Sequence, residues 1–528
     1  MSYETTQTTK ESGPEIHTVA FISLGCPKNL VDSERMLGLL AEEGIIPVEN
    51  HDMAEAVVVN TCGFLEAAKQ ESLEVIAEAV ERKKSGKVRR VIVAGCLVQR
   101  HRAKLLDWQP GIDAMIGVYD RDHIVEAVRG NSPRRITPVS SPGSSPRYWI
   151  SPNALQAAAA RGKDITNLTI RGDRGEGIGY YESDAARLRL TPRHYAYLRV
   201  SEGCNQNCTF CTIPSIRGKM RSKPAEAIAA EARELINDGV FELNLIGQDT
   251  TSYGMDIGYK EGLPGMLRVI NDALAPISGW GRLMYAYPTQ FTDEMIDTIA
   301  ELPHILNYID IPLQHINDRI LAAMRRNTTR RQTETLLEKL RERVPGIAIR
   351  TTMITGFPGE TGEEHNELVQ FIRDFGFDML GVFKHSRETG TISGKMEEDP
   401  ELAIPEEIKQ QRYDELMQAQ QEIAFDQTRY IAEQYKQSGI DGAVHLDVLI
   451  DQAEQDEETE QVGDNPKTYY GRAYHQAPMV DSLTCVISNR KLVPGELVRC
   501  VIVDSDGYDL IGRPLDELKP STSLSVLR

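Results

Sequence analysis

The chain has 528 residues, of which 41% are hydrophobic, and a formal net charge of −19. This length accommodates about three domains of ordinary size, and the acidic balance argues against a non-specific nucleic-acid binder and favours a basic partner. Residues 1–15 form a polar tail without the apolar core of a signal peptide, and no apolar run approaches the roughly 20 residues of a membrane span. We expect a cytoplasmic protein whose eight cysteines are metal ligands, catalytic groups or buried thiols rather than disulfides.

Residues 16–130 repeat the order strand, cysteine, helix three times. Each predicted strand is followed closely by a cysteine: 17–24 by Cys26, 56–60 by Cys62, and 91–94 by Cys96. The first helix is expected to run to about Glu43, with Asp32 or Ser33 as its N-cap. Because parallel strands end at one edge of a sheet, where ligands bind, the three cysteines should converge on a shared site. Three unrelated buried thiols are the alternative.

The segment 131–190 changes character. It is rich in Ser, Pro and Arg in its first part and in Gly and charge later, as in SSPGSSPR and RGDRGEGIG. This composition predicts a linker or mobile insertion.

Strand and helix patterns alternate again within 191–437. Six strand candidates follow one another: YLRVS, ELNLIG, RLMYAY, NYIDIP, AIRTTMITG and MLGVFKHS. This series predicts a complete or partial (β/α) barrel with its site at the C-terminal ends of the strands. The region closes with one long amphipathic helix at 405–437, whose Pro405 suits a first turn. The overall fold class is therefore α/β.

Short alternating segments separated by turns fill 438–517 and predict a small β-barrel. The acidic run 451–460 (DQAEQDEETE) is expected to be a loop between strands. Residues 518–528 form a C-terminal tail.

Three further cysteines, Cys204, Cys208 and Cys211, follow the first strand of the barrel region with the spacing C-x3-C-x2-C. A structural zinc site normally takes four protein ligands, and the nearest candidate for the fourth, His194, lies before the strand. A [4Fe–4S] cluster fits better, because three thiolates bind three irons and leave the fourth open to a small molecule.

The segment GCNQNCTFC, with Phe210 before its last cysteine, resembles the radical S-adenosylmethionine (SAM) superfamily. The resemblance implies that SAM binds the open iron and is cleaved to a 5′-deoxyadenosyl radical that abstracts hydrogen. Together with the first triad and the C-terminal barrel, the chain looks like the methylthiotransferase family. That resemblance implies a second [4Fe–4S] cluster on Cys26, Cys62 and Cys96 that carries the inserted sulfur. It also implies a second SAM as methyl donor and a barrel similar to the TRAM module.

The segments 23–34 (SLGCPKNLVDSE) and 60–72 (NTCGFLEAAKQES) resemble the branch of this family that modifies an aspartate of ribosomal protein S12 at its β-carbon. The tRNA-modifying branch more often has Gln-Met after the first cysteine. Between residues 441 and 515 we count 14 acidic and 6 basic residues, a balance that would repel RNA and attract a basic protein. The implied partners are S12, a reducing donor such as flavodoxin or ferredoxin, and a sulfur donor. A tRNA methylthiotransferase acting on a modified adenosine is the alternative.

No catalytic residue is assigned beyond the six cysteines. Gln314 and His315 end a strand and could face the cofactor, although a lone histidine is more often structural. The turn 356–360 could place backbone groups near SAM or could simply end a strand. Cys485 and Cys500 are expected to be core thiols. Four cations after the second triad could steer a carboxylate or lie in a solvated loop: Arg217, Lys219, Arg221 and Lys223.

Overall fold

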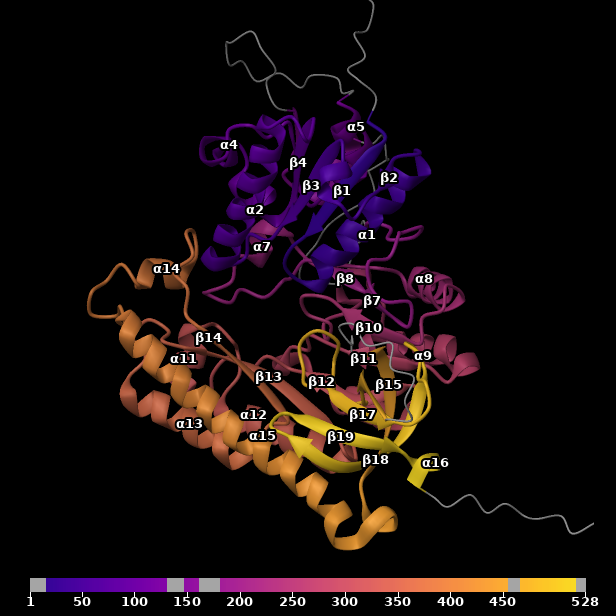
Figure 1. Cartoon of the computed structure of the whole chain (residues 1–528). Coiled ribbons are helices and arrows are strands. Elements are labelled where there is room, and N and C mark those ends of the chain that lie inside the picture. The colour runs from indigo at the N-terminus through magenta and orange to yellow at the C-terminus, as the bar shows by residue number, and fades with distance from the viewer. Residues whose placement is uncertain (1–15, 131–146, 161–180, 454–465, 519–528) are drawn as a thin grey trace, which may run out of the picture.

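The computed structural model describes residues 16–130, 147–160, 181–453 and 466–518. Both predicted tails, apart from Leu518, and most of the acidic run 451–460 lie outside these ranges. Within them the chain forms an N-terminal parallel sheet, a central parallel sheet and a C-terminal barrel. Figure 1 shows the N-terminal domain, in indigo, stacked on the central domain, with the yellow barrel lying against the central sheet. The predicted α/β architecture with a small β-barrel is confirmed.

The N-terminal sheet has the strand order β2-β1-β3-β4-β5-β6, with all neighbouring strands parallel. Its central strands are continuous runs of Val, Ile and Ala, as expected for parallel strands covered on both faces. The strand bounds are β1 Thr18–Ser23, β2 Ile46–Pro47, β3 Ala56–Thr61, β4 Arg90–Gly95, β5 Ala114–Ile116 and β6 Arg147–Trp149.

Helices cover both faces of this sheet. One face packs on α2 through Ile76 and Val80, and the other packs on α1 and α5 through Met36, Leu40 and Ile124. Burying both faces holds the strand ends, and therefore the cysteines that follow them, in fixed positions. The helices are α1 Pro27–Glu42, α2 Glu66–Lys84, α3 Cys96–His101, α4 Lys104–Trp108 and α5 Ile124–Arg129, with short 3₁₀ turns at His51–Met53 and Arg121–His123.

Helix α1 begins five residues earlier than its predicted N-cap. Its first residue is Pro27, and the N-cap is Cys26, which makes no side-chain capping bond. Proline is well suited to this first position because the N–H that it lacks has no partner inside the helix. Asp32 and Ser33 instead lie inside the helix and are buried. The prediction of either residue as the N-cap was wrong.

Both described parts of the predicted 131–190 linker pack against neighbouring domains. Strand β6 extends the N-terminal sheet by pairing in parallel with β5, and helix α6 (Ala154–Ala160) follows it. Further on, the buried carboxylate of Asp184 lies 2.7 Å from a guanidinium nitrogen of Arg121. These residues therefore fold as part of the protein body, although their composition alone predicts a linker.

The central sheet has the strand order β14-β13-β12-β11-β10-β7, again with all neighbours parallel. It is an open, partial version of the predicted barrel. The strand bounds are β7 Tyr195–Arg199, β10 Glu242–Ile246, β11 Trp280–Leu283, β12 Ile305–Asp310, β13 Ala348–Thr355 and β14 Met379–Lys384. A short antiparallel pair, β8 Ser201–Glu202 with β9 Arg221–Ser222, follows β7.

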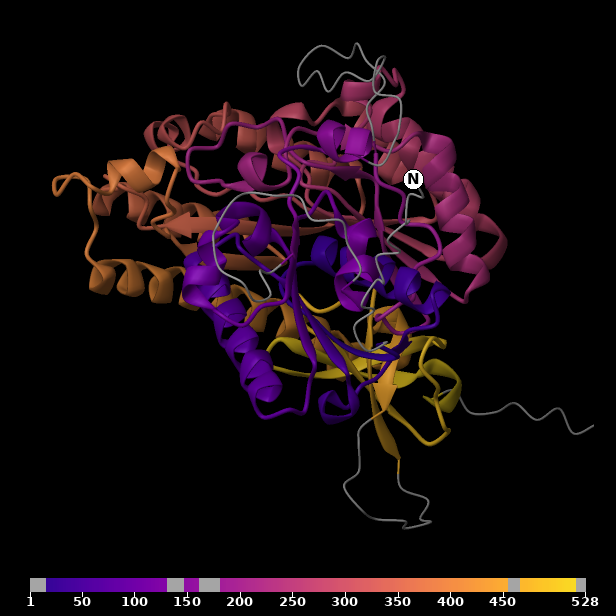
Figure 2. The same ribbon diagram turned by 90° about the horizontal axis from the view of Figure 1, so that it is seen from above.

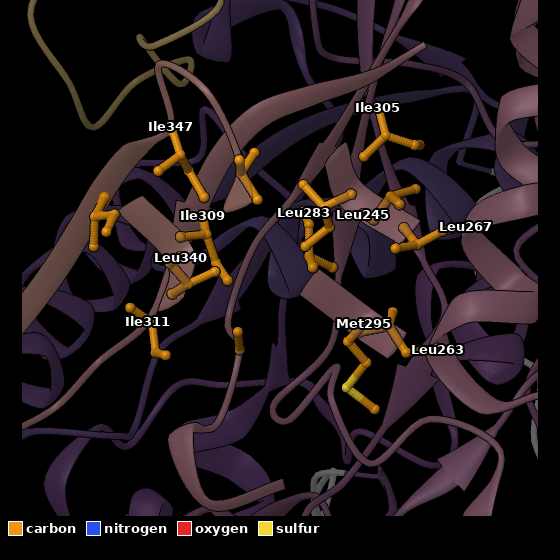
Figure 3. Packing of buried hydrophobic residues seen from close by; sticks show 14 of the residues in the cluster. Leu245, Leu263, Leu267, Leu283, Met295, Ile305, Ile309, Ile311, Leu340 and Ile347 are labelled. Carbon is orange, nitrogen blue, oxygen red and sulfur yellow. The ribbon is translucent and has the colours of Figure 1, made fainter. Parts of the chain in front are cut away.

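The outer face of the central sheet forms the largest apolar core of the described residues. Leu245, Leu283 and Ile309 pack from the strands against Leu267 and Leu340 of the helices, as Figure 3 shows. From above, the helices form an arc outside the strands (Figure 2). The main helices are α8 Ala225–Asn237, α9 Gly262–Leu274, α10 Asp293–Glu301, α12 Arg330–Arg343 and α13 Gly362–Phe375, and the shorter segments are α7 Ile213–Ile216, α11 Asp318–Ala323, α14 Ile392–Met396, Met255–Ile257, Ala275–Ile277 and Pro288–Gln290.

The inner face of the same sheet is polar and carries the C-terminal barrel. Glu242 accepts hydrogen bonds from Arg282 on the next strand and from Arg472 of the barrel, at 2.7 and 2.5 Å. An apolar contact between Leu306 and Leu449 extends the junction. The barrel is closed in the order β15-β16-β17-β19-β18, with bounds β15 His445–Ala453, β16 Lys467–Arg472, β17 Thr484–Ser488, β18 Leu497–Asp506 and β19 Asp509–Pro514, followed by α16 Leu515–Leu518.

The predicted long helix connects the two domains as α15 (Glu406–Gly442), with a break at Gly439 and Pro405 as its N-cap. No described helix is both long and apolar enough to cross a membrane.

A buried histidine between β14 and α15 makes stability depend on pH. Burial lowers the pKa of His385 to about 4 from an ordinary value of 6.5, so the unfolded chain binds a proton in this interval more readily than the folded chain. Stability is therefore lost as the pH falls from 6.5 towards 4, by about 1.4 kcal/mol per pH unit. We expect the Tm difference between pH 7 and pH 5 to be smaller in His385→Asn than in the wild type. An equal difference in both proteins would assign the acid sensitivity to other groups.

Candidate functional site

The first three cysteines all lie at junctions between a strand and a helix. Cys26 is the N-cap of α1, Cys62 lies between β3 and α2, and Cys96 is the first residue of α3. Because β1, β3 and β4 are adjacent and parallel, the three junctions share one edge of the sheet.

The turns that carry these cysteines pack without room for side chains between them. A Cβ added to Gly25 would lie 2.8 Å from Cys62 Cβ and 3.2 Å from its Sγ, and Gly25 has a φ of +90°. A Cβ added to Gly63 would lie 2.7 Å from Leu97 Cα and 3.0 Å from the Cys96 carbonyl carbon. Glycine at these two positions therefore permits the close approach of all three cysteine turns.

The three cysteines of the N-terminal triad differ in their exposure to solvent. Cys96 is buried, Cys62 is half-buried and Cys26 is exposed. Burial raises the pKa of the Cys96 thiol to about 12, opposed by the charge of Arg217, and it also raises the pKa of Cys62. The triad thus opens to solvent on the Cys26 side and is closed behind Cys96.

The second triad lies just past the end of β7, on the loop that leads into α7. Cys204 is buried, whereas Cys208 and Cys211 are half-buried. Backbone N–H groups of Gln206 and Ile213 donate to the sulfurs of Cys204 and Cys211, both at 3.4 Å. Such N–H···S bonds suit sulfur that carries negative charge. Burial again raises the pKa of these two thiols to about 12.

Cys208 lies beside a cation and an aromatic ring. A guanidinium nitrogen of Arg326 lies 3.6 Å from its sulfur, and the Tyr287 hydroxyl lies 3.9 Å away. Arg326 also stacks over the Tyr287 ring, 4.1 Å from the centroid, and donates to the Pro312 carbonyl. This cation compensates negative charge that develops at Cys208.

The loop that carries the central triad is anchored from behind. Thr209 donates through its backbone N–H to Met324 and through its hydroxyl to Ala323, and it accepts from the Ser393 N–H. Phe210, the aromatic residue before Cys211, packs against a buried cluster that includes Phe357. These contacts fix the loop against α11 and α14.

Both triads border one short segment, 212–217. Thr212, next to Cys211, donates to the carbonyl of Phe64, two residues after Cys62, at 3.4 Å. At the other end of the segment, Arg217 donates to Asn29 of α1 at 3.2 Å. The segment that directly follows the central triad therefore contacts the N-terminal domain at both of its ends.

A second contact joins the domains on the other side of the N-terminal triad. Glu388 of the central domain pairs with Arg100 of α3 at 2.9 Å, and both side chains are largely buried. The same carboxylate accepts from the backbone N–H of Glu66, the first residue of α2. Sequence reasoning missed Glu388, Arg100 and the inward-facing Asp32, because their partners lie far away along the chain.

Of the four cations after the central triad, three are buried rather than solvated. Arg217 contacts Asp32 and Glu202, Arg221 contacts Glu182, and Lys223 contacts Asp184 and Glu231. Only Lys219 among the four is exposed. The solvated-loop alternative therefore fails for Arg217, Arg221 and Lys223. Their carboxylate partners belong to the protein itself.

The remaining polar candidates have structural partners. His315 accepts from the Asn317 N–H at 3.0 Å and lies 3.5 Å from Glu360. The backbone N–H groups of Gly356 and Phe357 both donate to Glu360. Although burial disfavours its charge, hydrogen bonds from histidines hold the pKa of Glu360 at about 2. The backbone amides of Gly356 and Phe357 are therefore bonded within the turn 356–360. Gln314 has a φ of +76° and forms a β-bridge with β13.

His194 and the two barrel cysteines lie away from both triads. His194 precedes β7 and hydrogen-bonds Asp451 of the barrel at 2.7 Å, so it does not complete a zinc site with Cys204. Cys500 is fully buried in the barrel core, and Cys485 on β17 is half-buried.

The donors at both sites are thiols in sets of three, with N–H or guanidinium groups directed at the sulfurs. No group of three or more His, Cys, Asp or Glu side chains in the described ranges is arranged around a single metal ion. A [4Fe–4S] cluster does not require three ligands around one metal ion, because each of three thiolates binds a different iron. Soft thiolates with hydrogen bonds to sulfur fit an iron–sulfur cluster.

Comparison with known proteins divides the chain in the same way as its fold. Residues 198–372 match the radical SAM superfamily, 18–117 match the uncharacterized protein family UPF0004, and 444–515 match the TRAM domain. Among solved structures, the radical SAM methyltransferase TsrM from Kitasatospora setae aligns with a TM-score of 0.49 at 15% identity and covers 72% of this chain and 74% of its own.

The match to the radical SAM family model, with the cysteine triad just past β7, defines the protein as a radical SAM enzyme, a class that uses SAM and a [4Fe–4S] cluster. Curated relatives called ribosomal protein uS12 methylthiotransferase RimO cover most of the chain. The protein from Desulforamulus reducens is 40% identical over 94% of this chain and 99% of its own length. The protein from Geobacter sulfurreducens is 38% identical over 94% and 98%. The chain belongs to this family and is a radical SAM methylthiotransferase.

Proposed function

We propose that this protein inserts a methylthio group at the β-carbon of an aspartate in ribosomal protein S12, using two [4Fe–4S] clusters and two molecules of SAM. The observation that carries the proposal is the presence of two three-cysteine sets joined through the segment 212–217, which follows Cys211 and contacts the N-terminal domain at Phe64 and Asn29. The names of the relatives support the choice of S12 as substrate. When bound, the clusters and SAM supply a hydrogen-abstracting radical, a sulfur atom and a methyl group.

In this proposal Cys204, Cys208 and Cys211 hold the cluster that binds SAM. The backbone N–H groups at Gln206 and Ile213 stabilise the charge on two of the ligands, and Arg326 does so on the third. Because these three thiolates would bind three irons, the fourth iron would remain open to the amino and carboxylate groups of SAM.

Cys26, Cys62 and Cys96 hold the cluster that delivers sulfur. The open side at Cys26 gives an incoming sulfur donor access, whereas Cys96 is closed off by α3 and by Arg217. Beside this site, Lys28 lies 3.6 Å from the centroid of the Tyr285 ring. Burial lowers the pKa of Lys28.

A basic protein substrate fits the charge of the C-terminal barrel. Of its 14 acidic residues, eight lie between Asp447 and Asp464. Among the described ones, Asp451 and Asp481 pair inward with Arg472 and Arg350. Asp447, Glu496 and Asp504 pair with basic side chains of the chain itself at the surface. Because exposed pairs of this kind are weak, we infer that the net negative charge of the barrel can still attract lysines and arginines of a ribosomal protein. A reducing donor such as flavodoxin or ferredoxin, a separate sulfur donor and a cytoplasmic location complete the proposal.

The test is anaerobic reconstitution with iron, sulfide, SAM and dithionite, followed by incubation with S12 or with tRNA. We expect about eight iron atoms per chain, four for each cluster, and the mass of one methylthio group added to an S12 aspartate peptide. A methylthio group added to tRNA and not to S12 would support the alternative, a tRNA methylthiotransferase. Four irons per chain, or zinc, would overturn the two-cluster proposal.

A further inference from the structure

Lys28 is a buried lysine without a carboxylate in contact with it. It is the second residue of α1, two residues after Cys26, and it is only 6% exposed. Within the described ranges its ammonium forms no ion pair or hydrogen bond and lies instead over the Tyr285 ring, 3.6 Å from the centroid. Because the nitrogen is not among the fully enclosed polar atoms that lack a partner, it keeps some accessible surface. Buried lysines are normally paired, so this ammonium is suited to receive an anionic group from a ligand.

The carboxylates nearest in charge to Lys28 are already paired with arginines. Glu202 and Asp310 act on Lys28 through their charge without forming an ion pair with it. Glu202 pairs with Arg217 at 2.9 Å, and Asp310 pairs with Arg350 at 2.9 Å. Neither carboxylate is therefore free to serve as the partner of the lysine.

The ring under the ammonium places Lys28 between the two triads. Tyr285 lies just after β11, and Tyr287, two residues further on, has its hydroxyl 3.9 Å from the sulfur of Cys208 in the central triad. Lys28 itself follows Cys26 of the N-terminal triad. The contact between Lys28 and Tyr285 therefore joins the surroundings of the two triads, which is where the proposed reaction must hold its substrate.

The backbone and the barrel hold Tyr285 in place. Its φ is +60°, which is uncommon for a bulky residue. Its N–H donates to Asp310 at 3.3 Å, and its carbonyl accepts from the Thr250 N–H at 3.1 Å. The ring packs on the apolar cluster that includes Ala477 of the barrel. A ring fixed in this way also fixes the ammonium that lies over it.

We propose that Lys28 is a substrate-binding residue, whose ammonium pairs with the carboxylate of the S12 aspartate that receives the methylthio group. The inference rests on the proposed function, because it requires an aspartate as the substrate. In an aspartate the β-carbon is bonded directly to the carboxyl carbon, so holding the carboxylate also positions the C–H bond that reacts. The same pairing distinguishes aspartate from the neutral asparagine.

The experiment measures the binding of purified S12 to the full chain, reconstituted anaerobically with iron, sulfide and SAM. Two forms of S12 are compared: the natural protein and a variant with asparagine in place of the target aspartate. The wild-type enzyme should bind the aspartate form about ten- to a hundredfold more tightly. Lys28→Met, which removes the charge, should bind both forms equally, whereas Lys28→Arg should retain most of the preference. The matched control, Lys69→Met, removes a lysine 4.5 Å from the centroid of the Trp108 ring in the same domain and should retain all of it.

The iron content and the Kd of SAM are measured on the same samples, and both should be unchanged in Lys28→Met. If that variant loses iron, Lys28→Gln replaces it with the same expectation. An undiminished preference for aspartate, or weaker SAM binding with the preference retained, would overturn the inference and leave the proposed function intact. Equal binding of both forms by the wild type would also overturn it. Absence of a methylthio group from natural S12 after turnover would instead overturn the proposed function.

Discussion

Cys62→Ala is expected to abolish formation of the methylthio product while SAM cleavage to 5′-deoxyadenosine continues. Cys62 belongs to the N-terminal triad at the end of β3, whereas the three cysteines proposed to bind the SAM-cleaving cluster lie on the loop after β7. Removing one ligand of the first set leaves the backbone donors at Gln206 and Ile213 untouched. Product is measured by mass spectrometry of S12, and 5′-deoxyadenosine by chromatography.

The reciprocal variant, Cys208→Ala, is expected to abolish both reactions, because Cys208 is a proposed ligand of the cluster on which SAM cleavage depends. Cys485→Ala is the matched control: it removes a half-buried cysteine of β17 in the barrel and should retain product formation at about the wild-type level. The division of labour between the triads would be wrong if Cys62→Ala still produced methylthiolated S12. Loss of SAM cleavage in Cys62→Ala, with the central cluster intact by iron analysis, would show that the two sites do not act separately.

The positions of the six cysteines were accessible to sequence reasoning because a simple rule places them. Parallel strands end at a common edge, and each cysteine of the first triad comes directly after a strand of strong Val and Ile content. The spacing of Cys204, Cys208 and Cys211 is local, so no long-range folding needed to be inferred. Cysteines this close together in the sequence are also close together in the structure.

What surrounds the cysteines was not accessible in the same way. Arg217, Arg221 and Lys223 lie in a run of alternating cations that is typical of a solvated loop, but their carboxylate partners come from α1, β8, α8 and the segment before β7. Apart from Lys223 and Glu231, which are eight residues apart, the members of these pairs are separated by 15 residues or more, so no short window of sequence contains both. The start of α1 was predicted too late in the sequence because its N-cap, Cys26, is not among the usual capping residues.

The three-residue strand β6 shows the same limit on the scale of secondary structure. Its residues follow a stretch rich in Ser and Pro, and three residues are too few to display a period. The strand forms because β5 offers a free edge with which it pairs in parallel. The partner, rather than the propensity of the segment, determines the structure.

The largest expected effect on stability lies at the junction between the central sheet and the barrel. Glu242 is fully buried at the start of β10 and pairs with Arg282 and Arg472, which are also fully buried. Although burial disfavours its charge, the two guanidinium groups hold the pKa of Glu242 below its ordinary value. Glu242→Ala would leave both arginines without this partner in a desolvated site, which typically costs about 3–5 kcal/mol.

We expect Glu242→Ala to lower the denaturant midpoint of unfolding and to expose the connection between α15 and β15 to protease, because Glu242 of the central sheet pairs directly with Arg472 of the barrel at 2.5 Å. The matched control, Glu294→Ala, breaks the exposed pair with Arg268, whose side chains are 49% and 65% exposed, and should change stability by less than about 1 kcal/mol. If both variants unfolded at the wild-type midpoint, the buried pair would not hold the barrel on the sheet. Protease sensitivity at the junction, with the iron content unchanged, would instead show that the barrel detaches while the rest of the protein keeps its fold.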